Sequence, residues 1–596
     1  LELRGTLVVD DGGFDTFNLV LGPTATLDIG AGLYFAAGNT VRLDSGSAIT
    51  GTGEFRLNGG FNSNLDLPNG YTVTDAPWRL QGGLNIVGGS FAIGSTGVVK
   101  HDNDFVVVNT VDFSNAGTLS IGGGDFAFPH LHLHSGLFNT GTVTLDSFAL
   151  EEGYGATLDV FGGELVNQGI IESKDTAGLG AFSGDRLILG NVLNEGQINV
   201  DYDLTIDTTG GALVNSATGV INVASLQTLT VLDTGDFGIG EFFNEGTIDL
   251  NATNTTDGEQ TILDVSGIEF FNAGVIQGFG TIIGTVIDDG GTINLGASPG
   301  YLEIDGDYST SEKSTLAIEI AGDQAGVSYD QLVVSGRADL NGRLNVSLLN
   351  GFMPVSSAGF VILMAGTLEG SFAVASGLDI SDELVLDLNY VDDRVALVSV
   401  DVTKAGTNHD DVLSGSAGQD TSQGGDVIVA GAGDDVMVGL GAGDIAYGQE
   451  GDDTFGIESS GFNRIDGGDG IDTIQVGAGV DLAIFSQPGT AIDHIEILDL
   501  RNASDDQLVL DAAAIRNMVD AGGDNPLVLL GEAGDELDLR GDFELVGERA
   551  VEVNGVEMNL LELSEGDTSI LVSQEIAVTI YATDGSVTLV DDLIDT

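Results

Sequence analysis

The sequence predicts an all-β protein that begins with a parallel β-solenoid and continues into further β-rich segments. One observation is a short phrase built around Asn-x-Gly, which recurs through the first half of the chain. A second is the alternation of apolar and polar residues after each copy, which is typical of strands with one buried face. The third is composition, because 91 Gly and only 8 Pro among 596 residues favour many tight turns over a Pro-rich stalk.

Each copy of the phrase has two or three apolar residues, an Asn, one variable residue, a Gly and an alternating apolar run, as in FFNEGTIDL at Phe242. The repeated Asn residues are Asn115, Asn139, Asn167, Asn194, Asn215, Asn244 and Asn272, with spacings of 24, 28, 27, 21, 29 and 28. Asn215 belongs to a looser copy, LVNSATGVINV, that lacks Asn-x-Gly. A period of ~20–30 residues indicates one coil per repeat, and coils must stack to bury their apolar faces. We therefore predict a parallel β-solenoid over residues 1–290, with the Asn side chains hydrogen-bonded into a ladder.

The repeated phrases resemble the passenger β-helices of filamentous-haemagglutinin-like adhesins and autotransporters. The resemblance covers residues 90–290 and implies a β-helix on a bacterial surface. Residues 291–404 contain many alternating segments, for example YDQLVVSGRADLNGRLNVSLLNGF from Tyr329. This zone resembles the segment that closes the β-helix in autotransporter-like proteins, where a cap would cover unpaired backbone at the coil end. A separate β-sandwich is the alternative for residues 291–404.

Residues 405–480 are rich in Gly and Asp and contain GAGDDVMVG, LGAGDIAYG and QEGDDTFG. The spaced aspartates are Asp411, Asp420, Asp426, Asp435, Asp444, Asp453 and Asp472, with spacings of 9, 6, 9, 9, 9 and 19. The zone holds 12 Asp, 2 Glu and 1 Arg, a formal net charge of −13. Such a concentration of carboxylates is unfavourable unless cations neutralise it. A flexible Gly/Asp-rich linker is the alternative interpretation.

These segments resemble the nonapeptide repeats of RTX (hemolysin-type calcium-binding repeat) proteins, with the pattern Gly-Gly-x-Gly-x-Asp-x-apolar-x. The resemblance implies a calcium-binding parallel β-roll in which two nonapeptides form one coil, so that Asp435 and Asp453 lie on neighbouring coils. Aspartate supplies the hard oxygen that Ca²⁺ prefers, and Gly permits the tight turn. The expected metal-site residues are the seven spaced aspartates with Gly431, Gly433 and Gly451. The apolar residues two places after each Asp, such as Met437 and Phe455, are expected in the core.

The overall fold prediction is therefore a parallel β-solenoid followed by a β-rich cap, a calcium-binding parallel β-roll at residues 405–480 and a β-rich C-terminal region at 481–596. The last region contains one short helix in AIRNMVDAG, from Ala514. It resembles the C-terminal regions of large type I-secreted adhesins, which implies an export signal near the end of the chain. What preceded Leu1 is left open.

The net charge of −75 disfavours binding to nucleic acid or to anionic membranes. A salt-tolerant acidic surface without a specific ligand is an alternative reason for the charge. The absence of Cys excludes disulfides and thiolate chemistry, and no apolar run reaches the ~18 residues of a membrane helix. We expect no nucleic-acid partner and no membrane insertion.

Two groups of residues are considered as sites and not favoured. His130, His132 and His134 alternate along one predicted strand, so neighbouring imidazoles could share a Zn²⁺. The preferred interpretation is a polar outer face with Leu131 and Leu133 inward. β-Helices with RTX repeats also occur in alginate epimerases and lyases, but here only Lys100-His101-Asp102 and Asp125 near His130 offer comparable groups.

We expect an extracellular, calcium-dependent structural protein of the bacterial cell surface, exported by type I secretion and not an enzyme. As a matrix, surface-layer or filament subunit it would self-associate into a sheet or fibre. The first alternative is a monomeric adhesin that binds a glycan or protein partner. The second is a polysaccharide-active β-helix enzyme, an epimerase or a lyase.

Overall fold

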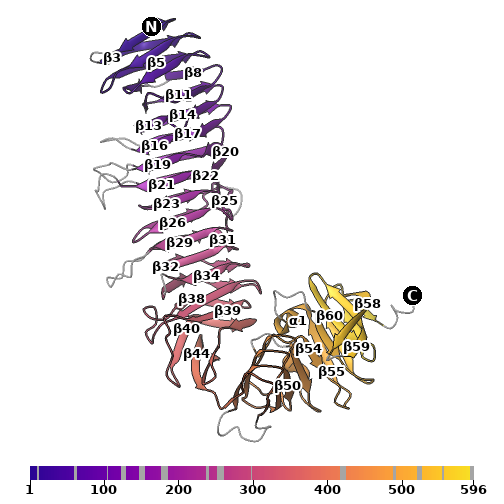
Figure 1. Cartoon of the computed structure of the whole chain (residues 1–596). Helices are drawn as coiled ribbons and strands as arrows, with labels where there is room; N and C mark the ends of the chain where they lie inside the picture. Colours follow the sequence, from indigo (N-terminus) through magenta and orange to yellow (C-terminus); the bar gives the residue numbers. More distant parts are fainter. Residues whose placement is uncertain are drawn as a thin grey trace. The chain divides into compact units, whose positions relative to one another are not determined.

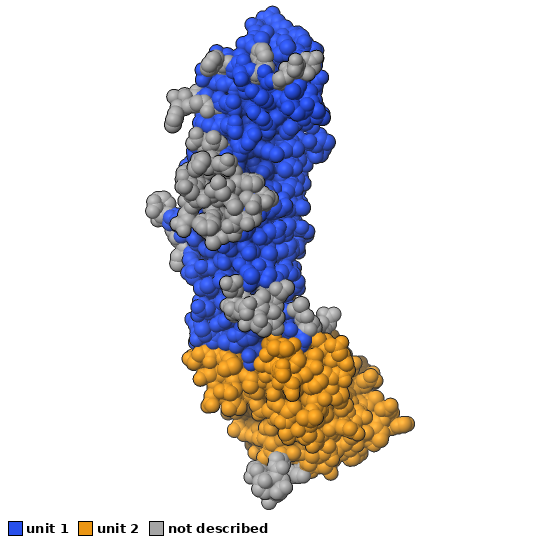
Figure 2. Space-filling model, turned by 90° about the vertical axis from the view of Figure 1, so that its left-hand side faces the viewer, with its two compact units in different colours: residues 1–309, 330–338 blue, residues 310–329, 339–596 orange. Residues whose placement is uncertain are grey.

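The computed structural model describes residues 1–9, 13–58, 63–103, 105–122, 129–146, 155–175, 185–235, 240–251, 261–296, 299–415, 425–486, 491–519, 526–553 and 556–590. The chain forms two compact units, which Figure 2 colours separately. Unit 1 comprises residues 1–309 and 330–338, and unit 2 comprises residues 310–329 and 339–596.

Unit 1 is a stack of parallel coils (Figure 1). The strand pairings show that a coil contributes one strand to each of three columns. One coil contains β14 (Phe105–Thr110), β15 (Phe113–Asn115) and β16 (Thr118–Gly122). The next contains β17 (His130–Leu133), β18 (Leu137–Asn139) and β19 (Thr142–Asp146). Each strand pairs in parallel with its equivalent one coil later, so the solenoid predicted from the Asn-x-Gly period is confirmed.

The later coils repeat this pattern, although the first and second strands of a coil are sometimes one continuous strand. The column that ends on the repeated Asn continues through β20 (Ala156–Asn167), β22 (Arg186–Asn194), β25 (Ala212–Asn215), β28 (Glu241–Asn244), β31 (Glu269–Asn272) and β33 (Val286–Asp288). The column after the Asn continues through β21 (Ile170–Lys174), β23 (Gln197–Val200), β26 (Val220–Ala224), β29 (Thr247–Asn251), β32 (Val275–Ile283) and β34 (Thr292–Leu295). The third column includes β24 (Leu204–Asp207), β27 (Thr228–Leu232) and β30 (Ile262–Gly267).

The first hundred residues are also coiled, as the solenoid predicted over residues 1–290 requires. They include β3 (Gly13–Leu21), β5 (Tyr34–Leu43), β7 (Glu54–Asn58), β8 (Ser63–Leu67), β10 (Trp78–Gln81), β11 (Leu84–Gly88) and β13 (Val98–Asn103), all paired in parallel. Large rings fill this end of the core, where Phe55 contacts Trp78 at a centroid distance of 5.2 Å. Phe91 stacks on Phe113 of the next coil at 5.3 Å, so coil-to-coil packing is aromatic as well as aliphatic.

The repeated Asn residues form the predicted ladder inside unit 1. From Asn115 to Asn272 each is at most 1% exposed, and the Nδ2 of each of the first six donates to the Oδ1 of the Asn one coil later at 2.7–2.8 Å. The ladder ends where Asn272 Nδ2 donates to Asp288 Oδ1 at 3.2 Å. An amide can both donate and accept, so every rung of a buried column can be satisfied without any added ion.

Parallel pairing continues beyond residue 290, where β32 pairs with β34 and with β35 (Tyr301–Asp305), and β35 pairs with β38 (Gln331–Leu340). In unit 2, β37 (Thr315–Ile320), β39 (Arg343–Leu348) and β41 (Val374–Ser376) are likewise parallel. Antiparallel pairing begins with β40 (Gly359–Gly370), β43 (Leu384–Val391) and β44 (Arg394–Asp401). These antiparallel strands lie within the segment that the sequence predicts as a cap.

The Gly/Asp-rich zone forms two parallel sheets that enclose one core. One sheet contains β45 (Lys404–Ala405), β47 (Val427–Ala432), β49 (Ile445–Glu450), β51 (Arg464–Asp469) and β53 (Ile492–Asp493). The other begins with β46 (Val412–Ser414), β48 (Val436–Leu440), β50 (Thr454–Ile457), β52 (Thr473–Val476) and β54 (Ile497–Asp499). Ile428, Met437, Ala446, Phe455 and Ile474 are all 0% exposed in this core, as the repeat pattern predicted.

The C-terminal region extends one of the two sheets. β56 (Leu527–Leu530) and β60 (Thr568–Ser573) continue the sheet of β54 in parallel, and β58 (Glu544–Val553) and β59 (Val556–Glu565) add an antiparallel hairpin. The predicted helix is α1 (Ala512–Met518), capped by Asp511, whose Oδ1 accepts the N–H of Ala514 at 2.8 Å. Across the described residues no helix has the length and apolarity needed to cross a membrane.

Candidate calcium centre

One column of carboxylates runs along the β-roll at the turns that precede β46, β48, β50, β52 and β54. The backbone N–H of Asp435 donates to Asp453 Oδ1 at 2.8 Å, and that of Asp453 donates to Asp472 Oδ1 at 2.7 Å. Asp411 begins the column, since its N–H donates to Asp435 Oδ1 at 2.6 Å. The prediction that Asp435 and Asp453 lie on neighbouring coils is therefore confirmed. We call Asp411, Asp435, Asp453, Asp472 and Glu496 the carboxylate column.

Three members of this column each keep one buried oxygen without a partner. Asp435, Asp453 and Asp472 are 0% exposed, and their Oδ2 atoms have no hydrogen-bond partner among the described residues. A buried carboxylate oxygen without a donor is costly, because it has lost its hydration and gained nothing in exchange. A hard divalent cation that prefers oxygen ligands would remove this cost. The donor set therefore fits calcium ions, with these three Oδ2 atoms as side-chain groups that would hold them.

The electrostatics of the column also favour a cation. Burial raises the pKa of Asp453 to about 7 and that of Asp472 to about 8, and neighbouring carboxylates add to both increases. The pKa of Asp435 is raised for the same reasons. The backbone N–H group that donates to each carboxylate lowers its pKa, because it stabilises the ionised form. This decrease is smaller than the increase caused by burial and by the neighbouring carboxylates. When bound, calcium supplies the positive charge that allows these groups to be ionised together.

The other predicted aspartates occupy a second position on the roll. The N–H of Asp426 donates to Asp444 Oδ1 at 2.7 Å, so these two also lie on neighbouring coils. Both have protein partners, because Lys404 Nζ contacts Asp426 Oδ2 at 2.8 Å and the N–H of Gly441 donates to Asp444 Oδ2 at 2.8 Å. Asp420 lies outside the described residues.

Gly431 lies near the end of β47, and Gly433 and Gly451 lie in the bends that follow β47 and β49. Gly431, Gly433 and Gly451 have φ values of 111°, 126° and 132°. A Cβ on Gly451 would lie 2.0 Å from the carbonyl oxygen of Gly433 on the neighbouring coil. Gly451 is therefore required both by its left-handed backbone and by the close approach of the stacked turn.

Sequence reasoning missed two features of this centre. Glu496 extends the carboxylate column, since the N–H of Asp472 donates to its Oε2 at 2.8 Å. It lies 24 residues after Asp472 and outside any nonapeptide, so the spacing gave no signal for it. An exposed outer row of Asp410, Asp434 and Asp452 runs beside the column, each accepting an N–H from the next coil at 2.9–3.2 Å. The Asp-Asp pairs at 410–411, 434–435 and 452–453 are the pattern that could have identified this row.

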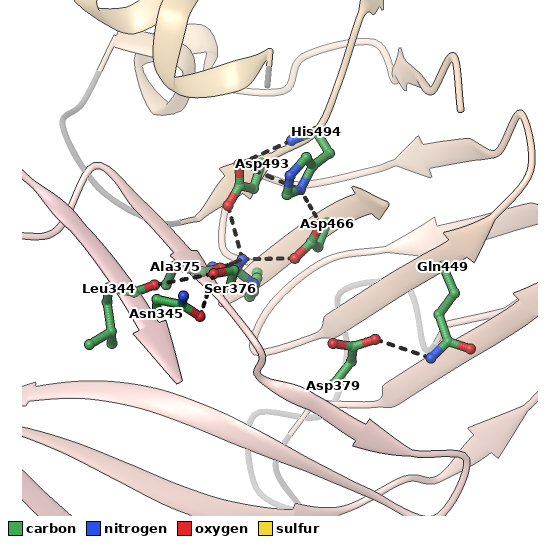
Figure 3. Close-up of polar contacts among 10 residues, drawn as sticks. Leu344, Asn345, Ala375, Ser376, Asp379, Gln449, Asp466, Asp493 and His494 are labelled. Carbon is green, nitrogen blue, oxygen red and sulfur yellow. Dashed lines mark hydrogen bonds and ion pairs between the residues drawn. The ribbon is translucent and has the colours of Figure 1, made fainter. Parts of the chain in front are cut away.

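A cluster of polar side chains joins the β-roll to strand β41 within unit 2. Figure 3 shows Asp466, Asp493 and His494 directed toward one another beside Ala375. Arg464, which is 5% exposed, places Nη2 at 2.8 Å from Asp466 Oδ2, 3.2 Å from Asp493 Oδ2 and 2.6 Å from the Ala375 carbonyl oxygen. Burial lowers the pKa of Arg464, but the negative charges of the two aspartates outweigh this effect, so the pKa is raised overall. Gln449 Nε2 makes a second link by donating to Asp379 Oδ2 at 3.1 Å (Figure 3).

His130 and His132 of β17, and His134 directly after it, lie on the outer face of the solenoid with Leu131 and Leu133 buried, as the preferred interpretation predicted. The structure adds Asp159 from β20, which the sequence did not identify. His132 Nδ1 lies 2.5 Å from Asp159 Oδ2, and His130 Nε2 lies 3.2 Å from the same oxygen. Burial acts against ionisation of Asp159, but the contacts with both imidazoles outweigh it and lower the pKa of this carboxyl.

The other groups considered for catalysis do not share one face. Strand β13 points His101 into the core at 0% exposure, where its Nδ1 contacts the Leu80 carbonyl oxygen, while Lys100 is exposed. Asp102 is engaged by Arg79 and by Gln81, whose Nε2 donates to it at 3.1 Å. Asp125 lies outside the described residues.

Comparison with known proteins agrees with the geometry of the roll. Residues 405–421, 420–455 and 459–483 match the RTX calcium-binding nonapeptide repeat, in 4 copies. The chain is also 27% identical over 173 residues to the uncharacterized protein YuaQ of Escherichia coli (strain K12). That match covers 28% of this chain and only 12% of the length of YuaQ. Residues 405–483 are thus similar to repeats that bind calcium and are typical of secreted extracellular proteins.

Proposed function

We propose that this chain is an extracellular structural protein of the bacterial cell surface whose β-roll becomes stably folded only when calcium is bound. The observation that carries the proposal is the carboxylate column, with three fully buried Oδ2 atoms that lack a partner among the described residues. Among the described residues no basic side chain is bonded to these three oxygens, and residues 405–480 contain a single Arg and no Lys. That Arg464 is already engaged by Asp466 and Asp493.

Calcium would confine stable folding of the roll to the outside of the cell. A ligand that binds the folded state alone stabilises it by about 2.7 kcal/mol at 100 times its Kd. Where the ion is scarce, the carboxylates repel and the buried oxygens stay unsatisfied. This dependence suits a protein that crosses the cytosol unfolded and folds after export, which supports type I secretion as the route.

The contacts of Arg464 and Gln449 give the roll a way to influence the cap. Both residues lie on roll strands, β51 and β49, and their partners Ala375 and Asp379 belong to the 374–381 segment of the cap. Unfolding of the roll would separate these pairs and leave the Ala375 carbonyl oxygen and the Asp379 carboxylate without these donors. We infer that calcium in the roll also stabilises the neighbouring cap strands.

We further propose that subunits assemble into an ordered sheet or fibre at millimolar calcium. A net charge of −75 makes subunits repel one another, and at about 0.1 M salt this repulsion is screened beyond ~10 Å. Divalent ions can bridge acidic faces as well as neutralise them. The exposed outer row of Asp410, Asp434 and Asp452 is one surface at which such bridging could occur.

Light scattering and electron microscopy across a calcium titration test the assembly proposal. Ordered particles are expected with millimolar calcium, with dispersal on chelation, and monovalent salt at equal ionic strength should not replace calcium. A monodisperse monomer over the whole range would refute assembly and favour the monomeric adhesin, while leaving calcium-dependent folding intact.

Incubation with alginate or pectin is expected to give no cleavage or epimerisation, and turnover that disappears in His130→Ala would overturn the non-enzymatic assignment.

A further inference from the structure

The outer face of the solenoid holds a compact group of metal-ligand side chains far in sequence from the calcium repeats. His130 and His132 lie two residues apart on β17, and Asp159 lies on β20 of the next coil. The register pairs His132 directly with Asp159, so all three side chains leave the same face of two adjacent parallel strands. One ligand atom from each residue lies within 4.8 Å of the other two.

We propose that His130, His132 and Asp159 bind one divalent ion of the zinc class on the solenoid wall. The ligand atoms are His130 Nε2, His132 Nδ1 and Asp159 Oδ2. Zinc bonds of about 2.0–2.1 Å in tetrahedral geometry separate neighbouring ligand atoms by about 3.3 Å. The observed separations of 3.2 Å and 2.5 Å from Asp159 Oδ2 to the two nitrogens require only small side-chain movements.

The surroundings position the ligands without closing the site. Phe105 lies edge-on to His130 at a centroid distance of 4.6 Å, and Phe161 packs against His132 at 5.5 Å. These two rings restrict the imidazole rotamers, which reduces the ordering that binding requires. The side chains of His130, His132 and Asp159 remain 30%, 17% and 16% exposed, so an ion can enter from solvent and retain water as a fourth ligand.

The chemistry of the donors separates this site from the calcium centre. Two of its three ligands are imidazole nitrogens, which suit zinc, copper or nickel, whereas calcium takes oxygen ligands. Millimolar calcium should therefore leave the site free for zinc. Because its ligands come from two coils, a bound ion would also cross-link β17 to β20 and add to the stability of the solenoid.

The test uses the full chain in millimolar calcium, which keeps the β-roll folded, and titrates zinc by calorimetry with metal analysis after dialysis. One zinc per chain is expected. His132→Ala and Asp159→Asn should each weaken zinc binding by more than about tenfold, the lower end of the loss seen even for outer-shell partners. Cobalt bound at the same site should show the visible absorption of a tetrahedral ion, and both substitutions should abolish it.

Two control variants remove imidazoles that the proposal does not use. His134→Ala takes away the imidazole that directly follows β17, and His494→Ala dismantles the group of Asp466, Asp493 and His494, the other described cluster with metal-ligand spacing. Both should retain zinc affinity within about twofold of the unmodified chain, well below the loss at a ligand. Circular dichroism in calcium checks that all variants are folded. Unchanged affinity in folded His132→Ala, or equal loss in a control variant, would overturn the proposal.

Discussion

The solenoid and the β-roll both stack one polar side chain per coil, but they use different chemistry to do so. In the solenoid, seven buried Asn residues donate and accept in turn, and Asn194 Nδ2 reaches Asn215 Oδ1 at 2.7 Å. In the roll, the buried carboxylates accept one backbone N–H each and retain oxygens that no described residue satisfies. The amide ladder is complete within the protein, whereas the carboxylate column requires a cation.

This difference shows how one architecture can be made independent of ions or dependent on them. A carboxylate has only acceptor atoms, so a stack of carboxylates cannot satisfy itself as a stack of amides can. Stacked charges also repel at short range in a medium of low polarity. The stability of the solenoid should therefore be insensitive to calcium, while that of the roll should depend on it.

Removal of calcium should have the largest effect on this comparison. In excess chelator we expect residues 405–480 to lose protection against hydrogen exchange, while the core strands of unit 1 keep theirs. Mass spectrometry of exchanged peptides resolves the two regions in one sample. Equal protection of the roll with and without calcium would refute its dependence on the ion, and simultaneous loss in both regions would refute the independence of the solenoid.

Substitution of the carboxylate column should have the next largest effect. Asp435→Asn combined with Asp453→Asn removes two of the three unpaired oxygens, so calcium affinity should fall by more than the ~10–100-fold typical of losing an outer-shell partner. Asp426→Asn should weaken affinity less, because Asp426 is already paired with Lys404. Calorimetric titration of calcium measures both effects.

The outer row supplies a control with the same change of charge. Asp434→Asn combined with Asp452→Asn also removes two negative charges, but from exposed side chains next to the column. If position rather than net charge decides affinity, this variant should bind calcium almost as well as the unmodified chain. An equal loss in the two double variants would mean that the column acts only through its overall charge.

Interruption of the amide ladder should give a smaller effect in the opposite region. Asn194→Leu leaves Asn167 without its acceptor and Asn215 without its donor in the ladder, at ~1–3 kcal/mol for each unsatisfied group. Thermal unfolding of unit 1 should move to lower temperature while calcium affinity is unchanged. Asn222→Ala breaks an Asn–Asn bond on the half-buried outer face and should cost less. An equal loss of stability in the two variants would show that burial of the ladder does not contribute to the stability of unit 1.

Periodicity predicted the two columns, but it did not predict contacts that depend on local register. The Asn phrase and the nine-residue Asp spacing recur along the chain, so stacking follows once the period is known. Asn139 pairs with Asn167 at a separation of 28, whereas His132 pairs with Asp159 at 27. The cause is one extra residue in β20 between Val160 and Leu165, compared with Leu133 to Leu137. Extrapolation from the Asn spacing would have placed Val160 opposite His132 and missed the carboxylate.

The pH dependence of the stability of the calcium-stripped protein should show the smallest effect, and it depends on the carboxylate column, because the amide ladder has no titratable group. Burial places the pKa of Asp453 at about 7 and that of Asp472 at about 8, above the value of about 3.9 for an unfolded Asp. The folded roll then binds more protons than the unfolded chain, so without calcium its stability should fall as pH rises from 5 to 8. With calcium the trend should reverse, because the ion binds deprotonated carboxylates and its affinity increases over the same range. Thermal melts of stripped and calcium-loaded protein at pH 5 and pH 8 measure both trends. Asp453→Asn should reduce the pH dependence of the stripped roll, and an unaltered dependence in that variant would assign the effect to the general negative charge of the chain.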